Sequence, residues 1–240
     1  MNQGKICVSV CGETASEVLD KISRATLDAD VIEIRFDCLK PDEILPLIDK
    51  LDSFSKPLLI TFRPREQGGF RDLTVEERRS FWTTISSLKA KDFLVDHEFD
   101  LAWGDGFDPN RSIVSLHDFD RSPENLPDTI QTLSARDDRI IKIAVAIDSV
   151  EEGVDVWKLL DQASQSIPIA MGEAGKWTRV LGLAHGAAMT YASLDEGGKT
   201  APGQISASDL RNVFRVKELD NNTKVFGLIA ANKPNTLVLL

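Results

Sequence analysis

The sequence has few cysteines and no long apolar run. Its three cysteines, Cys7, Cys11 and Cys38, make no even-numbered framework and show no C-x-x-C spacing, so we expect no disulfide framework. No stretch approaches the roughly 18 consecutive apolar residues of a membrane-spanning helix. Residues 1–5 lead directly into a strand-like segment and lack the apolar core of a signal peptide. These absences favour a reduced, cytoplasmic setting without a membrane partner.

Basic charge is also scarce. The chain carries 28 Lys and Arg against 38 Asp and Glu, and no basic stretch is interleaved with aromatic residues. Binding of nucleic acid through a general positive surface is therefore not expected, and an anionic substrate would need a local basic pocket. The three histidines lack the spacing of a zinc site. No G-x-G-x-x-G follows the first expected strand, which argues against a dinucleotide-binding sheet.

Apolar segments of strand length alternate along the chain with stretches of helical period. The expected strands are residues 5–10, 31–37, 57–63, 92–99, 112–118, 139–146, 167–173 and 188–193. The expected helices are residues 16–27, 41–51, 74–88, 123–133, 150–163 and 206–213. Residues 100–110 hold too much Gly, Asp and Pro for a proper helix.

Eight such units in a chain of 240 residues predict an α/β fold, the (β/α)8 or TIM barrel. A doubly wound open sheet is the alternative architecture. We expect one barrel domain over residues 1–217, followed by a C-terminal extension over residues 218–240.

Charged residues stand inside strands that should be buried on both faces. Lys142 lies in the middle of the segment RIIKIAVA, on the same face as Ile140 and Ala144, whose small side chain leaves room for the lysine. A single such residue is usually a rim or snorkelling side chain. Here Glu, Arg, Asp, His and Lys on five strands would converge in one barrel mouth, where an unpaired buried charge costs several kcal/mol. We therefore expect a functional site at the carboxyl ends of the strands.

Six segments resemble, in order, the type I 3-dehydroquinate dehydratase family: EIRFD, TFRPREQGG, SLHDFDRSPE, KIAVA, MGEAGKWTR and TAPGQIS. The resemblance runs from about residue 6 to about residue 215. It implies a shikimate-pathway lyase, active in aromatic amino acid biosynthesis, that forms a lysine Schiff base inside a TIM barrel. It implies no metal and no other cofactor.

The resemblance also implies roles for individual residues. Lys142 matches the imine-forming lysine, whose neutral amine would attack the C3 ketone of 3-dehydroquinate. His117 matches the general acid/base, which would take the C2 proton made acidic by the iminium and return a proton to the departing C1 hydroxyl. The matching substrate-binding positions are Ser9, Glu33, Arg35, Arg63, Arg179, Thr200 and Gln204.

Two features depart from the family pattern. The family commonly has a glutamate that orients the histidine where this chain has Gln67, so Gln67 or Asp96 is expected to take that part. The tail segment TKVFGLIA resembles the entry strand of a shikimate dehydrogenase domain fused behind such barrels, so the tail is a linker or remnant of a fusion, or an ordinary extension. The implied partners are a carboxylated cyclic polyol as substrate and either a second copy or a fused or associated shikimate dehydrogenase.

Two other functions remain open from the residues. Another Schiff-base barrel lyase, such as a class I aldolase, shares the lysine, although three arginines suit a carboxylated polyol better than a phosphate. A barrel that binds the ligand without turnover is the non-enzymatic alternative. The Gly-rich stretch at residues 194–204 is expected to form a lid.

Overall fold

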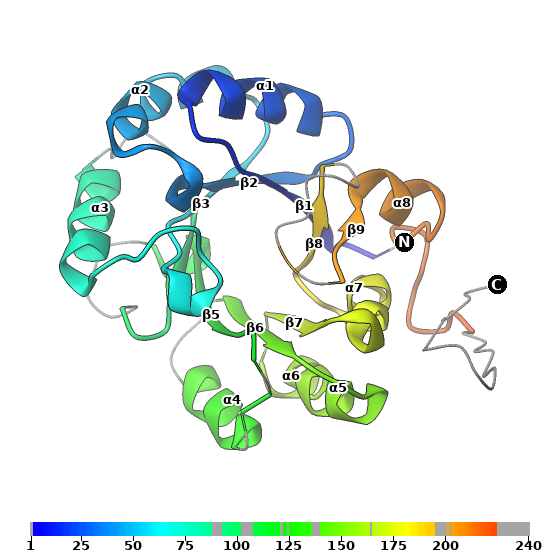
Figure 1. Cartoon of the computed structure of the whole chain (residues 1–240). Helices are drawn as coiled ribbons and strands as arrows, with labels where there is room; N and C mark the ends of the chain where they lie inside the picture. Colours follow the sequence, from blue (N-terminus) through cyan, green and yellow to red (C-terminus); the bar gives the residue numbers. More distant parts are fainter. Residues whose placement is uncertain are drawn as a thin grey trace.

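A computed structural model of the chain describes residues 2–87, 93–101, 108–120, 122–123, 125–135, 140–163, 165–194, 201 and 203–224. Figure 1 shows strands arranged around a centre with helices outside them. The strands are β1 (Lys5–Val10), β2 (Val31–Arg35), β3 (Leu58–Thr61), β4 (Leu94–Glu98), β5 (Ser112–Asp118), β6 (Ile140–Ala146), β7 (Ser166–Met171), β8 (Met189–Ser193) and β9 (Ile205–Ser206).

Helices follow most of the strands. The α-helices are α1 (Ala15–Ala25), α2 (Ile44–Ile48), α3 (Val75–Ser87), α4 (Leu126–Ser134), α5 (Val150–Trp157), α6 (Leu159–Gln162), α7 (Lys176–Leu181) and α8 (Ala207–Asn212). Short 3-10 turns are η1 (Phe36–Cys38), η2 (Pro41–Glu43), η3 (Leu51–Ser53), η4 (Arg65–Gln67), η5 (Pro109–Arg111), η6 (Glu173–Gly175) and η7 (Gly182–His185).

All strands are parallel and pair in the order β7-β6-β5-β4-β3-β2-β1-β8-β9. The predicted (β/α)8 barrel and its eight strands are confirmed, and the two-residue β9 adds to them. β7 and β8 form no ladder among the described residues, although the backbone N–H of Ala188 donates to the carbonyl of Ser166 at 2.9 Å. Among the described residues, the barrel wall therefore has its fewest backbone hydrogen bonds between β7 and β8.

Several element ends differ from the sequence prediction, and α7 was not among the expected helices. β2 stops at Arg35 because Phe36–Cys38 turns into η1, which bends the chain over the mouth of the barrel. The expected helix over residues 150–163 divides at Lys158 into α5 and α6. The segment 102–107, within the weak unit after the fourth strand, lies outside the described residues.

The outer face of the strands packs on amphipathic helices. α1 illustrates the rule: Thr14 caps it by accepting from the backbone N–H of Glu17, and its buried residues recur every three or four positions. Those residues, among them Val18 and Ile22, join the outward-facing Ile32 of β2 in one apolar cluster. Burial of this face stabilises the ring of strands around its centre.

The inner face of the strands changes from apolar to polar along the barrel axis. A lower layer is apolar and includes Cys7, Val31, Leu59, Ile113, Ile140, Ile167 and Met189. Two residues further along, the same face of β1, β2, β3, β5 and β6 carries the buried polar residues Ser9, Glu33, Thr61, Ser115 and Lys142. The apolar layer forms a floor, so these polar side chains meet near the carboxyl ends of the strands.

Cys11 and Cys38 form a disulfide with a Cα–Cα distance of 5.6 Å. The expectation that no cysteines would pair is wrong for these two, because they follow the neighbouring strands β1 and β2 and meet at the barrel mouth. Cys7 is a free, buried thiol, and burial raises its pKa. None of the described helices combines the length and apolar character needed to cross a membrane.

Candidate active site

Lys142 extends from the middle of β6 into the barrel and is 4% exposed. Its Nζ donates to Oδ2 of Asp96, on β4, at 2.9 Å. The same atom lies 3.8 Å from the centre of the Tyr191 ring, on β8. A buried amine thus has a carboxylate on one side and the face of an aromatic ring on another.

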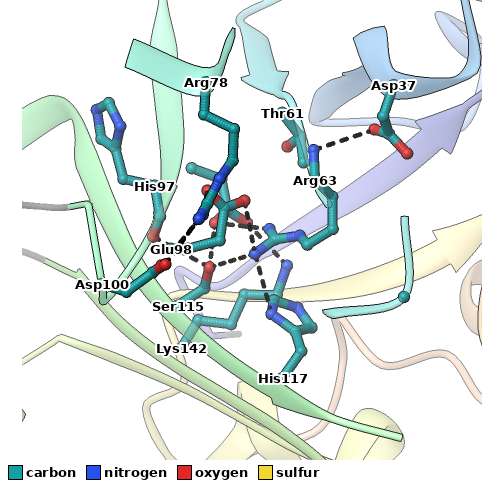
Figure 2. A network of polar contacts seen from close by, with 12 residues as sticks. Asp37, Thr61, Arg63, Arg78, His97, Glu98, Asp100, Ser115, His117 and Lys142 are labelled. Carbon is teal, nitrogen blue, oxygen red and sulfur yellow. Dashed lines mark hydrogen bonds and ion pairs between the residues drawn. The ribbon is translucent and has the colours of Figure 1, made fainter. Parts of the chain in front are cut away.

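Asp96 joins the lysine to a wider polar network (Figure 2). Its Oδ1 accepts from the hydroxyl of Ser115 at 2.5 Å and pairs with the Arg63 guanidinium at 2.8 Å. Burial opposes ionisation of this carboxyl, but Arg63 and Lys142 outweigh it and hold the pKa of Asp96 well below its usual range. Asp96 is therefore a carboxylate that holds two cations.

Arg63 follows β3 and is buried against groups from two other strands. Its NH1 donates to the hydroxyl of Ser115 at 2.7 Å and lies 3.0 Å from Nδ1 of His117, both on β5. NH1 also lies 3.3 Å from Oε1 of Glu98. Burial opposes the charge, but Asp96 and Glu98 raise the pKa of Arg63, which stays a cation.

Glu98 extends the network outward to α3. Its Oε2 lies 3.4 Å from NH1 of Arg78, whose NH2 in turn donates to Asp100 at 2.8 Å. Burial raises the pKa of Glu98 to about 7 although Arg63 and Arg78 oppose it. Figure 2 shows the guanidinium of Arg78 pointing toward Glu98 and Asp100, so this branch links the site to the helix layer.

His117 stands beside Arg63 and Lys142 at the end of β5. Burial, then Arg63 and Lys142, lower the pKa of His117 well below its usual value, so the imidazole is neutral at pH 7. The ring of Phe119 lies nearly parallel to it, with 6.5 Å between ring centres. The partner of Nδ1 is Arg63, whereas Gln67 and Asp96, the two residues proposed from the sequence to orient this ring, make no hydrogen bond to it among the described residues.

A second polar group lies on β1, β2 and β3. Glu33 accepts from Ser9 at 2.5 Å and from Thr61 at 2.8 Å, which fixes its carboxyl inside the barrel. Arg35 binds Asp37 through two hydrogen bonds of 2.9 and 2.8 Å. Burial opposes its charge, but Asp37 raises the pKa of Arg35 above its ordinary value.

The turn after β3 brings Gln67 to the mouth of the barrel, near Arg35 and His117. Gly68 ends η4 with φ of 80°, and a Cβ on Gly69 would lie 1.9 Å from the carbonyl oxygen of Arg63. Only glycine fits this close approach, so the paired glycines fix the turn. Arg35 donates to the carbonyl of Gly68 at 3.1 Å, and Oε1 of Gln67 is buried with no hydrogen-bond partner among the described residues.

These groups line one cavity that opens at the mouth of the barrel. Its lining includes Ser9, Glu33, Arg35, Arg63, Gln67, His117, Lys142, Arg179, Tyr191 and Gln204. The structure thus brings together all but two of the residues singled out from the sequence. Asp96 lies beneath the lining and contacts it through Lys142, and Thr200 lies outside the described residues.

Arg179, on α7, differs from the other arginines of the cavity. It is 2% exposed, its NH1 reaches the carbonyl of Tyr191 at 3.4 Å, and its Nε has no partner among the described residues. No carboxylate pairs with it in the described part of the chain, and burial lowers the pKa of Arg179 to about 10. A buried guanidinium that is still charged at pH 7 and faces a cavity is suited to bind an anion.

Tyr191 was not singled out from the sequence as a site residue. The signal was present, since Tyr191 lies two residues after Met189 on the inward face of an expected strand. Its single hydroxyl and aromatic ring gave no reason to prefer a site over packing. The described residues also contain no group of three His, Cys, Asp or Glu that could hold a metal ion.

Fold and site together define a class: a TIM-barrel protein in which a buried lysine amine, a neutral histidine and an arginine without a carboxylate partner among the described residues share one cavity at the carboxyl ends of the strands. The family model described as "Type I 3-dehydroquinase" matches residues 6–221. The chain belongs to the type I 3-dehydroquinase family.

Individual relatives agree with this assignment. The chain is 30% identical over 225 residues to a 3-dehydroquinate dehydratase of Streptococcus pneumoniae, covering 88% of this chain and 98% of that protein. The crystal structure of 3-dehydroquinate dehydratase from Geobacillus kaustophilus superposes with a TM-score of 0.77 at 27% identity, covering 89% of this chain and 91% of the other. The dehydroquinate dehydratase and shikimate dehydrogenase chain of S. pombe shares the fold, with a TM-score of 0.71 at 20% identity; the match covers 90% of this chain and 45% of that one.

Proposed function

We propose that this chain is a 3-dehydroquinate dehydratase, a lyase that converts 3-dehydroquinate to 3-dehydroshikimate in the shikimate pathway through a Schiff base on Lys142. One observation carries the proposal beyond family membership. The Lys142 amine and the Arg179 guanidinium line the same cavity, and Arg179 has no carboxylate partner among the described residues. A ketone next to the lysine and a carboxylate on the arginine are two functional groups of one small substrate.

The chemistry begins at Lys142. Its neutral amine attacks the C3 ketone, and loss of water leaves an iminium between Nζ and C3. The ammonium form first loses its proton to solvent; Asp96, at 2.9 Å from Nζ, stays ionised, so that its carboxylate faces the iminium cation. The Tyr191 ring, at 3.8 Å, faces the same charge. These two neighbours stabilise the cation that the reaction needs as an electron sink.

His117 carries the proton. The iminium draws electrons from the C2–H bond, the imidazole takes that proton, and the electrons form an enamine. The C1–O bond then breaks, and the hydroxyl leaves as water with a proton from the imidazolium. Hydrolysis of the remaining imine frees Lys142 and releases 3-dehydroshikimate. A neutral histidine suits this sequence, since burial lowers the pKa of His117 and the imidazole therefore starts without the second proton at pH 7.

The remaining cavity residues bind the ring substituents. Arg179 holds the carboxylate, and Arg35 and Arg63 contribute further N–H donors. Ser9, Glu33 and Gln204 are suited to the hydroxyl groups, as is Thr200 in the expected lid. Asp96 holds the lysine from beneath the cavity lining, and Gln67 lies in the lining with an Oε1 that can accept a hydrogen bond.

We infer two features of the wider setting. The barrel spans residues 1–217, and residues 218–240 are a linker or remnant of a fused shikimate dehydrogenase; the S. pombe neighbour, which carries both enzymes in one chain, supports this reading. A homodimer is the other arrangement that we propose.

Reduction with sodium borohydride in the presence of 3-dehydroquinate, followed by intact-mass measurement, tests the function. The wild-type protein should gain one covalent adduct, Lys142→Ala should gain none, and the ultraviolet absorbance of the enone product should rise only with the wild type. Binding without an adduct would contradict the Schiff base. An adduct without the absorbance change would mean that Lys142 forms the Schiff base but that the protein does not dehydrate 3-dehydroquinate.

A further inference from the structure

The contact between Arg63 and His117 fixes which ring nitrogen carries the proton. NH1 of Arg63 lies 3.0 Å from Nδ1 of His117. A guanidinium is always charged and has only donors, so Nδ1 must be the acceptor in this pair. Because the imidazole is neutral, its one proton is then on Nε2.

The hydrogen bonds around Arg63 run in one consistent direction. NH1 has two hydrogens, and it has two acceptors: Nδ1 of His117 and, at 2.7 Å, the hydroxyl of Ser115. The Ser115 hydroxyl in turn donates a hydrogen bond to Oδ1 of Asp96 at 2.5 Å. NH2 of Arg63 forms an ion pair with Oδ1 of Asp96 at 2.8 Å, and NH1 forms a longer one with Oε1 of Glu98 at 3.3 Å. Asp96 therefore anchors the guanidinium whose other end occupies Nδ1.

This arrangement blocks the first proton transfer of the proposed reaction. Nδ1 is occupied by Arg63, and Nε2, which makes no hydrogen bond to a described residue, already carries a hydrogen. Neither nitrogen can accept the C2 proton. A carboxylate at position 67 would have accepted from Nδ1–H and set the opposite tautomer, but this chain has Gln67 there.

We propose that Arg63 is a positioning residue that holds His117 as its Nε2–H tautomer in the free enzyme, and that substrate activates the histidine by drawing NH1 away from Nδ1. The hydroxyl and carboxylate oxygens of the substrate supply acceptors for that NH1 group. Nε2 then loses its proton to solvent and Nδ1 gains one, with no net change in charge. The inference rests on the proposed function, since it concerns the base of that reaction.

Gln67 supplies the acceptor for the second tautomer. Its Oε1 is buried, has no partner among the described residues, and lines the same cavity as His117. The neighbouring Gly68 lies against Phe119, whose ring is nearly parallel to the imidazole. Once Arg63 has moved, the amide carbonyl accepts from Nδ1–H and keeps Nε2 bare toward the substrate. The orphaned carbonyl thus gains a partner only in the active arrangement.

Nitrogen NMR of protein labelled with 15N-histidine tests the first half without any turnover. His117→Ala assigns the His117 signals among the three histidines. In the free wild-type enzyme, Nδ1 should give the shift of a bare nitrogen and Nε2 that of a protonated one. A protonated Nδ1 overturns the proposal. Arg63→Lys keeps a donor and should keep the tautomer if its shorter side chain reaches Nδ1. Arg63→Gln offers both a donor and an acceptor and should give a mixture of the two tautomers. Because both variants lose contacts to Asp96, the wild-type spectrum decides.

The second half is tested on Lys142→Ala with 3-dehydroquinate, where binding occurs without an imine. The two His117 nitrogen signals should exchange their character on saturation, and should fail to do so in the double variant with Gln67→Leu. Binding that leaves Nε2 protonated overturns the release step. Turnover by Gln67→Leu should fall at least tenfold with the free-enzyme tautomer unchanged. If the wild-type protein does not turn over 3-dehydroquinate, the proposed function is refuted. The tautomer of the free enzyme is unaffected by that result, because it is measured without substrate.

Discussion

Asp96 and Lys142 form a buried ion pair, with Oδ2 of the aspartate 2.9 Å from Nζ of the lysine. Both residues are almost wholly excluded from solvent, at 0% and 4% exposure. Two charges at such depth are tolerated only because they face each other, and removal of one leaves the other unpaired. This pair therefore governs both the stability of the barrel and the charge of the proposed nucleophile.

Asp96→Asn should lower the free energy of unfolding at pH 7 by about 3 kcal/mol, because it leaves Lys142 and Arg63 without their shared carboxylate. The pKa of Asp96 is lowered from 3.8 in the fold. Its stabilising contribution is thus present above that value and is lost as the pH falls further. Urea unfolding at several pH values should show the gap between wild type and variant closing in acid. Equal stability at pH 7 would contradict the ion pair.

Arg179→Met should separate binding from stability. The guanidinium has no carboxylate partner among the described residues, so its loss should leave the free energy of unfolding unchanged or slightly higher, while KM rises about 100-fold, equivalent to ~3 kcal/mol. Steady-state kinetics and urea unfolding measure the two effects.

Arg78→Met is the matched control for Arg179→Met. Arg78 is also a buried arginine, but it is paired with Glu98 and Asp100 outside the cavity lining. The Arg78→Met variant should have a free energy of unfolding about 2 kcal/mol lower than the wild type, with only a small change in KM. The prediction for Arg179 fails if both variants behave alike.

Glu98→Gln should change how stability depends on pH. Burial raises the pKa of Glu98 from 4.5 to about 7, so the fold favours the protonated acid. The associated stability is present below about pH 4.5 and is lost as the pH rises through about 7. Glutamine resembles the protonated acid and does not titrate. Between pH 5 and pH 8 the wild type should therefore lose about 2 kcal/mol relative to the variant; a difference independent of pH would refute this.

The sequence predicted the barrel because eight apolar segments alternate with helical stretches, and the period of two within strands placed Glu33, Ser115 and Lys142 on the inward face. Residues that are close along one strand could be assigned in this way. The identity of the group that would bind Nδ1 of His117 could not, because it depends on how far the long side chain of Arg63 turns.

The disulfide shows the same limit. Cys11 and Cys38 are 27 residues apart, and they meet because β1 and β2 are neighbours and η1 turns the chain inward. An odd number of cysteines gave no indication of a pair. Strand order could be expected from the barrel, but the positions of side chains beyond the strand ends depend on turns that the sequence pattern does not specify.

Reduction of the Cys11–Cys38 disulfide should destabilise the protein. The bond closes a loop of sequence separation 27, which is worth about 3 kcal/mol in the chain-entropy account. A reductant should therefore lower the midpoint of thermal unfolding by roughly 6–12 °C. Thiol titration of the denatured protein should count one free thiol before reduction and three after it. Cys11→Ser combined with Cys38→Ser should be insensitive to reductant; a reductant effect in that variant would assign the change to another cause.

The contact of Lys142 with Tyr191 can be divided into the ring and its hydroxyl. Nζ lies 3.8 Å from the ring centre, while the hydroxyl is buried with no partner among the described residues. Tyr191→Phe should keep the rate of adduct formation under borohydride and match or exceed wild-type stability, because it removes an unsatisfied buried group. Tyr191→Leu should slow adduct formation about tenfold, since a ring over a desolvated cation is worth ~1–2 kcal/mol. Rapid-quench mass measurements give both rates, and equal rates for the phenylalanine and leucine variants would show that the ring only packs.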